Sequence, residues 1–295
     1  MTLEQLRIFV AVADRQHLTR AAGALNLSPS AVSTAIRTLE ERYGARLFDR
    51  VGRGIELTET GRDFLPEARQ ALAAAAAAEQ ALTERGGTLR GKLAIQASQT
   101  VSAYWLPQPL MRLHAAHPGI ALDLTIGNTE TVSRAVGEGA ADLGFIEGEI
   151  DEPALAMRLV AADRLVLLTA PGHPWAQGAA PSAADLAGAR WILRERGSGT
   201  RSAFEASIRS DGLDPAALDI VMTLPSNEAI LTALEAGPYA GVTSERVAAN
   251  ALAAGRLRRI DYALRPRPFR MLWHKERYRT RAARAFEALL PNELA

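Results

Sequence analysis

Apolar residues recur at helical spacing in three segments at the start of the chain. Leu3, Leu6, Phe9 and Val10 fall on one side of segment 2–13, which predicts an amphipathic helix. The same spacing predicts a second helix over 19–25, which Thr19 can cap, and a third helix that begins after Ser28. We expect the three helices to bury their apolar faces against one another in one compact core.

The third helix has a strong start signal and two different faces. Ser28 supplies a capping hydroxyl, and Pro29 takes the first helical position, where no N–H is needed. Val32, Ile36 and Leu39 form the inward face. The outward face carries small hydroxyl side chains and one arginine, namely Ser30, Ser33, Thr34 and Arg37.

This outward face suits the major groove of DNA. Small side chains permit close approach, hydroxyl groups can bond to phosphates or bases, and Arg37 can pair bidentately with guanine. A small helical hairpin with a polar surface would show the same pattern. The following segment, RLFDRVGRGIEL, favours DNA binding because it predicts a β-hairpin wing. Arg50 and Arg53 on that wing can contact phosphates or the minor groove.

A long helix is predicted from about Thr58 to Arg85. Its apolar positions 65, 68, 72, 75 and 82 follow the spacing of a coiled-coil seam, which Glu79 interrupts. An alanine run makes the seam narrow, so two such helices could pack closely and we expect a dimer. The alternative is that this helix packs on the C-terminal part of its own chain.

From residue 92 onward, short apolar runs alternate with helical stretches. This pattern predicts an α/β domain with mostly parallel sheets, and its length suits two lobes. We expect a winged helix-turn-helix over 1–57, a dimerising linker helix over 58–86, a glycine hinge over 87–91, lobe one over 92–162 and 266–295, and lobe two over 163–265.

Three motifs occur in a characteristic order in the N-terminal part. They are AA at 21–22, SPSAVSTAIRTLEERYGARLFDR at 28–50 and LTETG at 57–61. In these motifs the chain resembles the LysR-type transcriptional regulators, and the resemblance extends over essentially its whole length. It implies an N-terminal winged helix-turn-helix, a dimerising linker helix and a two-lobed effector domain with the fold of periplasmic solute-binding proteins.

The resemblance also implies partners and DNA contacts. We expect a homodimer or homotetramer that binds double-stranded promoter DNA, responds to a small molecule and contacts RNA polymerase. The positions that match the family's DNA-binding residues are Ser28, Ser30, Ser33, Thr34, Arg37, Arg50 and Arg53.

Polar residues follow several predicted strands of the C-terminal part. In α/β folds ligands bind outside the C-terminal ends of strands. Ser98, Gln99 and Thr100 begin a helix, where hydroxyls and free N–H groups suit a carboxylate or another small anion. In the resembling family this position commonly contacts the effector. The segment GSGTR at 197–201 can form a nest of N–H groups, to which Arg201 adds charge. Both segments could also be ordinary helix caps.

Glu147 ends another predicted strand and complicates the choice of ligand. A carboxylate opposes an anionic ligand unless it pairs with an arginine or with a cationic part of the ligand, so amphoteric and neutral ligands stay open. The segments ASQTVSAYWLP and GSGTR resemble regulators of sulfur assimilation and carbon fixation, which favours a small anionic or phosphorylated metabolite. The candidate effector-binding residues are Ser98, Gln99, Thr100, Asn128, Thr129, Glu147, Ser198, Gly199, Thr200, Arg201 and Asn227.

Two further features carry less chemistry. His114 and His117 lie three residues apart on a predicted helix, but without Cys or a nearby carboxylate we expect no metal site. The arginine-rich stretch 256–284 is interpreted as largely a solvated face with charges at helix ends. An accessory DNA or subunit contact there is the alternative.

Composition excludes several classes of protein. The chain has 295 residues, a net charge of +1 and no cysteine, so it can form neither disulfides nor a thiol redox sensor. No stretch is apolar enough to span a membrane, and the N-terminal segment is not a signal peptide, so we expect a cytoplasmic protein. We expect no cofactor besides the small-molecule effector.

The leading hypothesis is an effector-responsive transcription factor. An enzyme with a DNA-binding appendage is the rival, but the five histidines form no evident nucleophile–base or metal constellation. A plain solute-binding protein would leave residues 1–85 without a role.

Overall fold

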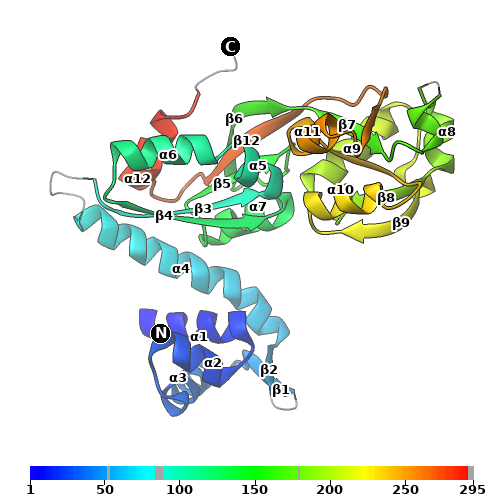
Figure 1. The fold of residues 1–295 in the computed structure, drawn as a ribbon. Coiled ribbons are helices and arrows are strands. Elements are labelled where there is room, and N and C mark those ends of the chain that lie inside the picture. Colours follow the sequence, from blue (N-terminus) through cyan, green and yellow to red (C-terminus); the bar gives the residue numbers. More distant parts are fainter. Residues whose placement is uncertain (52–53, 84–88, 179, 292–295) are drawn as a thin grey trace. The chain divides into compact units, whose positions relative to one another are not determined.

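The computed structural model describes residues 1–51, 54–83, 89–178 and 180–291 (Figure 1). The chain divides into two compact units, of which the first contains Met1–Gly87 and the second nearly all of the remainder. The described residues contain no helix that is both long and apolar enough to cross a lipid bilayer.

The first unit is a winged helix-turn-helix that continues into a long helix. Its elements, in order, are α1 (Leu3–Arg15), α2 (Leu18–Leu25), α3 (Pro29–Tyr43), the hairpin of β1 (Phe48–Val51) and β2 (Gly54–Leu57), and α4 (Glu59–Thr83). The predicted helices and the predicted wing are therefore confirmed.

Helix caps explain where these helices begin. Thr2 forms a capping box with Gln5 at the start of α1, and the Ser28 hydroxyl accepts a hydrogen bond from the Ala31 N–H at the start of α3. The predicted capping by Thr19 is wrong: α2 begins one residue earlier and has His17 at its N-cap.

The core of the first unit lies between α1, α3 and the start of α4. The Phe9 ring lies 5.4 Å from the Phe48 ring and 5.0 Å from the Phe64 ring. Ala68 of α4 is 1% exposed, and Leu65 and Leu72 pack against the same core. The first half of the predicted coiled-coil seam thus packs within its own N-terminal unit; the side chain of Leu82 lies outside the described residues.

The second unit contains two five-stranded sheets, one in each lobe. The first has the order β4 (Ile120–Gly127), β3 (Gly91–Ser98), β5 (Leu143–Glu147), β12 (Arg267–His274), β6 (Leu155–Asp163). The second has the order β11 (Arg258–Ile260), β7 (Leu165–Thr169), β10 (Ala240–Ser244), β8 (Arg190–Arg194), β9 (Asp219–Leu224).

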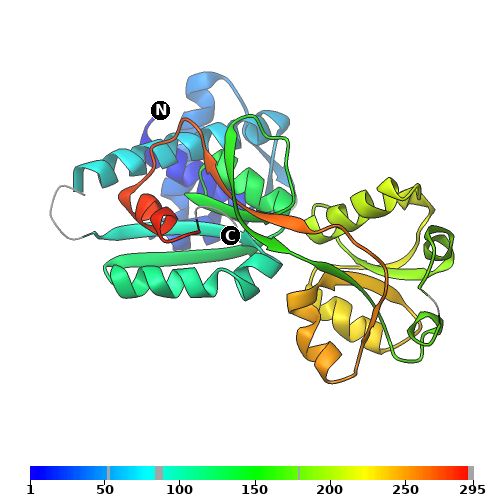
Figure 2. The same cartoon turned by 90° about the horizontal axis from the view of Figure 1, so that it is seen from above.

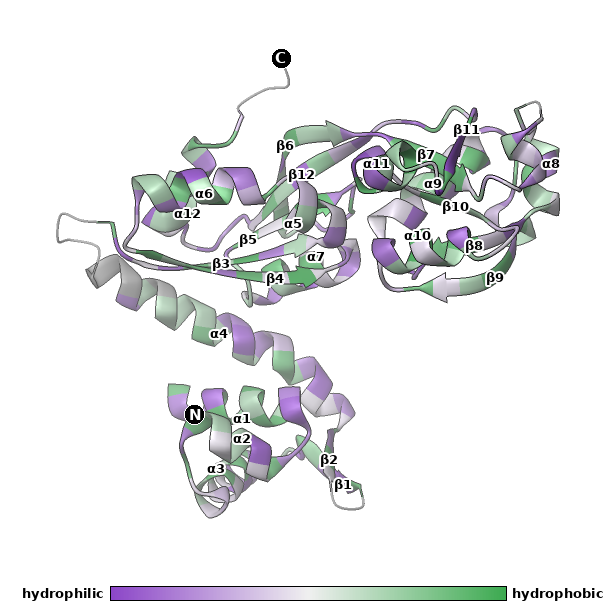
Figure 3. Ribbon diagram, in the orientation of Figure 1, coloured by the Kyte–Doolittle hydropathy of each residue, from purple (hydrophilic) through white to green (hydrophobic). Residues whose placement is uncertain are grey.

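Helices cover both sheets. In the first lobe these are α5 (Gln99–Tyr104), α6 (Pro107–Ala116), α7 (Thr129–Glu138) and α12 (Arg281–Ala288). In the second they are α8 (Ala183–Gly188), α9 (Gly199–Ser210), α10 (Asn227–Glu235) and α11 (Glu245–Ala253), with the short 3₁₀ turns η1 (Pro174–Ala176) and η2 (Pro215–Ala217). Helices such as α6 and α12 carry both hydrophilic and hydrophobic residues, as expected for helices that cover a sheet on one side (Figure 3).

The sheets are mixed, so the prediction of mostly parallel sheets is wrong. β3 pairs in parallel with β4 and β5, and β8 pairs in parallel with β9 and β10. β12 is antiparallel to β5 and β6, and β7 is antiparallel to β10 and β11. The physical reason is the path of the chain, which passes between the lobes from β6 to β7 and back from β11 to β12 (Figure 2). These strands enter their sheets without a helical crossover, so they are free to pair antiparallel.

The interpretation of 256–284 as largely a solvated face agrees with the exposure of most of its arginines, but it is wrong for the strand residues that the stretch contains. This stretch contains β11 and β12, and β12 lies inside the first sheet. Arg267 at its first position is only 2% exposed. Along β12, Phe269 and Met271 are buried in the core, Arg267 lies buried at a position of the same alternation, and Arg270 is half-buried between the two apolar residues, so the strand's pattern was concealed in the sequence.

Candidate functional site

The outward face of α3 is open to solvent. Ser30, Ser33, Thr34 and Arg37 are all exposed, whereas Val32, Ile36 and Leu39 on the other side are buried. Arg37 Nε lies 3.8 Å from Glu41 Oε1, and both side chains are about two-thirds exposed. An exposed pair of this kind contributes little to stability, so the guanidinium can leave Glu41 for another partner.

Ser28 has a structural task that its neighbours lack. Its hydroxyl accepts from the Ala31 N–H at 3.2 Å and lies 2.9 Å from the Ser30 hydroxyl. It fixes the first turn of α3, so of the predicted DNA-contacting hydroxyls it is the one already occupied by a cap.

The wing is anchored to α3 by a residue that the sequence analysis did not single out. The Glu40 carboxylate accepts hydrogen bonds from the N–H groups of Leu47 (2.8 Å) and Phe48 (3.2 Å). Arg50 is exposed on β1, opposite Ile55. Arg53 lies outside the described residues.

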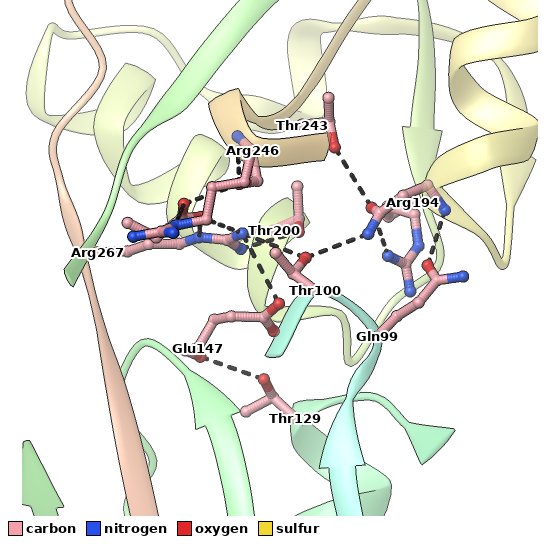
Figure 4. Close-up of polar contacts among 12 residues, drawn as sticks. Gln99, Thr100, Thr129, Glu147, Arg194, Thr200, Thr243, Arg246 and Arg267 are labelled. Atoms are coloured by element: carbon pink, nitrogen blue, oxygen red, sulfur yellow. Dashed lines mark hydrogen bonds and ion pairs between the residues drawn. The ribbon is translucent and has the colours of Figure 1, made fainter. Parts of the chain in front are cut away.

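Polar strand ends of the two lobes meet around Asn227, which is fully buried. Its side-chain amide donates to Thr100 Oγ1 at 3.1 Å and accepts from Arg194 Nη1 at 2.8 Å. Its backbone N–H donates to Gln99 Oε1 at 2.7 Å (Figure 4). The N-terminal turns of α5 in lobe one and α10 in lobe two are therefore joined directly.

Arg267 lies at the centre of a second group of contacts. Its Nε and Nη2 donate to Asp163 Oδ2 at 2.9 and 2.7 Å, across the pairing of β12 with β6. Its Nη1 donates to Thr200 Oγ1 at 2.8 Å, and its Nη2 lies 3.5 Å from Thr100 Oγ1 (Figure 4). One guanidinium thus contacts the helix starts of both lobes and the strand that connects them.

Carboxylates surround this guanidinium on more than one side. Glu147, 3% exposed at the end of β5, lies 3.7 Å from Arg267 Nη2. Asp163 also accepts from the Ser244 hydroxyl at 2.8 Å and lies 3.7 Å from Arg246. Buried charges persist only when they are paired and hydrogen-bonded, and this cluster meets that condition.

The second buried arginine, Arg194, has its own carboxylate. It donates from Nε and Nη2 to the two oxygens of Glu195 at 2.8 and 3.0 Å. Burial by itself raises the pKa of Glu195, but the hydrogen bonds and charge of Arg194 outweigh it, and the net pKa is lowered.

The lobes approach so closely that only glycine fits at two positions. A Cβ on Gly199 would lie 2.6 Å from both the Glu147 carbonyl oxygen and Thr129 Oγ1. A Cβ on Gly197, where φ is +84°, would lie 2.6 Å from a Glu130 carboxylate oxygen. The Glu130 N–H donates to the Gly197 carbonyl at 3.3 Å, which adds a backbone contact between the lobes.

Most of the predicted effector residues come together here. Gln99, Thr100, Thr129, Glu147, Gly199, Thr200 and Asn227 line the contact between the lobes. Asn128 lies at the edge of this contact between the lobes. Its side-chain oxygen accepts from the Thr131 N–H at the start of α7, and its amide nitrogen donates to Glu195 at 3.2 Å.

Three predicted residues behave differently. Arg201 makes its contacts within lobe two, donating from Nε to Glu205 and from Nη1 to the Arg194 carbonyl oxygen. Ser198 is buried at the N-cap of α9, but its hydroxyl makes no cap hydrogen bond. The buried Ser98 hydroxyl has no hydrogen-bond partner in the described part of the chain.

Sequence reasoning missed Arg194, Asp163 and Arg267. Arg194 had a weak signal, since it ends the apolar run of β8 and strand ends were the places searched. Asp163 and Arg267 had none, because each lies on a strand that the pattern did not reveal. Among the described residues, no group of three His, Asp or Glu side chains is placed to hold a metal ion.

Comparison with known protein families gives two matches that together cover nearly the whole chain. Residues 3–62 match the family model described as bacterial regulatory helix-turn-helix protein, lysR family. Residues 86–295 match the model described as LysR substrate binding domain.

Individual relatives agree with these matches. The chain is 36% identical over 289 residues to the uncharacterized HTH-type transcriptional regulator YeiE of Escherichia coli, covering 97% of this chain and 96% of YeiE. It is 31% identical over 297 residues to the RuBisCO operon transcriptional regulator of Allochromatium vinosum, covering 100% and 97%. Its fold is similar to that of a full-length OxyR variant from Pseudomonas aeruginosa, with a TM-score of 0.71, 21% identity, and 100% and 99% of the two chains covered.

Proposed function

The chain belongs to the LysR family of DNA-binding transcriptional regulators, and from that premise we propose that a small anionic effector in the interlobe cleft controls how it binds its promoter. The observation that carries this proposal is Arg267, a buried cation whose donors reach the helix starts of both lobes.

The DNA contacts form the first part of the proposal. We assign base and phosphate contacts to Ser30, Ser33, Thr34 and Arg37, supported by their shared exposure on α3. Ser28 acts mainly by fixing the helix start, and Arg50 and Arg53 contact the backbone from the wing. Phosphate contacts fix the orientation of the protein on the DNA, whereas base contacts determine which DNA sequence is bound.

The effector site forms the second part. An anion can accept hydrogen bonds from Thr100, Thr200 and the buried guanidinium of Arg267, in a setting where charge-assisted bonds are strong. Glu147 lies beside that guanidinium, so an anion must displace its carboxylate or offer it a hydrogen-bond donor. Because the same side chains already join the two lobes, an effector that takes their bonds changes the equilibrium between closed and open lobes.

The remaining assignments follow from how family members act. We propose a homodimer or homotetramer that works with RNA polymerase on chromosomal DNA, and therefore in the cytoplasm. The small alanine side chains late in α4 support pairing of linker helices, although Leu65, Ala68 and Leu72 serve the core of their own unit. We also propose that residues 1–57 bind DNA, 58–86 pair the two chains, 87–91 form a hinge, and 92–162 with 266–295 and 163–265 form the two lobes.

A single experiment with two readouts tests the proposed function. Thermal unfolding of the purified protein is followed against sulfur oxyanions, carboxylates and sugar phosphates, because a ligand that binds only the folded state raises the melting temperature. The stabilising compound is then added to a gel-shift or anisotropy assay with a promoter fragment that the protein binds. We expect Thr100→Val to remove the stabilisation and to leave basal DNA affinity unchanged.

Two results would contradict the proposal. Stabilisation that survives both Thr100→Val and Thr200→Val places the ligand elsewhere. An effector that binds the cleft without altering either DNA affinity or the length of DNA protected means that the cleft does not control promoter binding.

A further inference from the structure

A cavity lies within lobe two, next to the segment of that lobe that contacts lobe one. It has a volume of about 580 Å³ and follows α9, from the loop after β8 to the start of β9. We call it the α9 cavity. Its size falls within the range of about 300–1,000 Å³ that is usual for small-molecule sites.

Three arginines line the α9 cavity, and two of them lack a partner among the described residues. Arg201 is held by Glu205 at 2.7 Å, and its side chain is 11% exposed. Arg196 and Arg209 also line the cavity, are exposed, and form no side-chain hydrogen bond or ion pair with any residue that the structure describes. Each guanidinium therefore has up to five N–H donors free for a ligand.

The carboxylates of the cavity do not balance these arginines. Glu205 is committed to Arg201, and Asp214 accepts the Ala216 N–H at 3.0 Å as the cap of η2. Three arginines against two carboxylates leave one uncompensated positive charge, at the side where Arg196 and Arg209 have free donors. Guanidinium groups bind carboxylates and phosphates through paired N–H···O bonds.

The wall of the α9 cavity is shared with the interlobe contact. Arg196 stands between Glu195, which accepts from Asn128 of lobe one, and Gly197, whose carbonyl accepts from the Glu130 N–H. Arg201 donates to the carbonyl of Arg194, whose side chain contacts Asn227. A ligand that fixes Arg196 also restrains the segment that touches lobe one.

We propose that the α9 cavity is a second anion site, which binds a small multiply charged anion of the carboxylate or phosphate class between Arg196 and Arg209. Binding at this site is independent of the proposed function. Its regulatory consequence, a bias toward closed lobes, rests on the proposed function.

The test uses the intact protein and two defined probes. Citrate represents carboxylates and tripolyphosphate represents phosphates, and binding of each is measured by isothermal titration calorimetry. We expect saturable one-to-one binding of at least one probe, weakened on the order of tenfold or more in the double variant R196A/R209A. The matched control is R256A/R259A, which removes two exposed lobe-two arginines outside the cavity and so changes the net charge equally.

The outcomes are separable. Loss of binding in R196A/R209A, with retention in R256A/R259A and in Thr100→Val, supports the α9 site, and the probe that binds identifies the acid class. Loss in Thr100→Val places the anion in the cleft and overturns the proposal. Equal weakening in both double variants means diffuse attraction to net charge, and no saturable binding of either probe also overturns it. None of these results depends on promoter binding, so failure of the proposed function is recognised separately by the DNA assay.

Discussion

The outward face of α3 and the interlobe cleft use the same side chains in opposite environments. On α3, serine, threonine and arginine are exposed, and Arg37 meets Glu41 only at 3.8 Å between two exposed groups. In the cleft, Thr100, Thr200 and Arg267 are at most 2% exposed, and Arg267 is bonded to Asp163 at 2.7 Å.

The exposure or burial of these side chains determines whether a mutation in each region changes DNA binding, folding stability or both. An exposed ion pair is worth little to folding, so the α3 face can be changed with little effect on stability. A buried ion pair has already lost its hydration, so removing one partner leaves a charge without compensation. We therefore expect mutations on α3 to separate DNA binding from stability and mutations in the cleft to couple the two.

The largest effect is expected from breaking the buried pair. Arg267→Met leaves Asp163 and Glu147 buried without their guanidinium and should destabilise the second unit by about 3–5 kcal/mol. Urea unfolding followed by intrinsic tryptophan fluorescence measures this, since the chain's four tryptophans are at positions 105, 175, 191 and 273. The double variant Arg267→Met/Asp163→Leu should regain part of the loss because it removes both charges. If the double variant is no more stable than the single variant, the loss of stability comes from lost side-chain packing and not from an uncompensated buried charge.

Next in size is the effect of Arg37→Ala on DNA. Loss of a bidentate contact to a base should cost about 1–3 kcal/mol of binding free energy, which is roughly fivefold to 150-fold in affinity. The melting temperature should stay constant, because the side chain is 67% exposed. Fluorescence anisotropy with promoter DNA provides the affinity, and Arg7→Ala, which removes an equally loose exposed pair on α1, is the control. Equal losses in both variants would indicate a general charge effect and not a contact from α3.

Two glycine substitutions extend the comparison to the backbone. Gly199→Ala places a methyl group 2.6 Å from the Glu147 carbonyl oxygen, so it should hold the lobes apart and cost about 1–3 kcal/mol. Gly137→Ala in α7 meets no atom within 4 Å and should stabilise by roughly 0.5–1 kcal/mol through helix propensity. Thermal unfolding distinguishes the two, and X-ray scattering should show wider lobes only for Gly199→Ala. The same sign of change in both would refute tight closure at Gly199.

The smallest effect is expected from pH. Arg194 lowers the pKa of Glu195 below its ordinary value of 4.5, so this pair contributes stability above that value and loses it as the pH falls through the lower folded pKa. Glu195→Gln should flatten the stability curve between about pH 5 and 3 relative to the native chain. Asp151→Asn, at an exposed carboxylate without a partner among the described residues, should leave the curve unchanged. An unchanged curve in Glu195→Gln would mean that Arg194 does not stabilise this carboxylate.

The N-terminal unit could be predicted from the amino-acid sequence alone, because its signals are local. The Ser28–Pro29 start, the buried side of α3 at Val32, Ile36 and Leu39, and the wing hairpin all depend on residues a few positions apart. Local patterns also pointed to Thr100, Thr200 and Asn227, since Thr100 and Asn227 shortly follow apolar runs and Thr200 lies in the glycine-rich segment GSGTR at 197–201.

The contacts of these residues emerged only from the folded chain. Asn227 and Thr100 are 127 positions apart, and Arg267 and Asp163 are 104 positions apart. Neither contact can be predicted from the local spacing of apolar residues. The burial of Arg267 and the direction of the Arg201 side chain could not be predicted either, because the sequence does not distinguish an arginine on a solvated face from one in a buried charge cluster. Periodicity reports which side of one element is apolar, whereas a binding site forms where several elements converge and desolvate the same few charges.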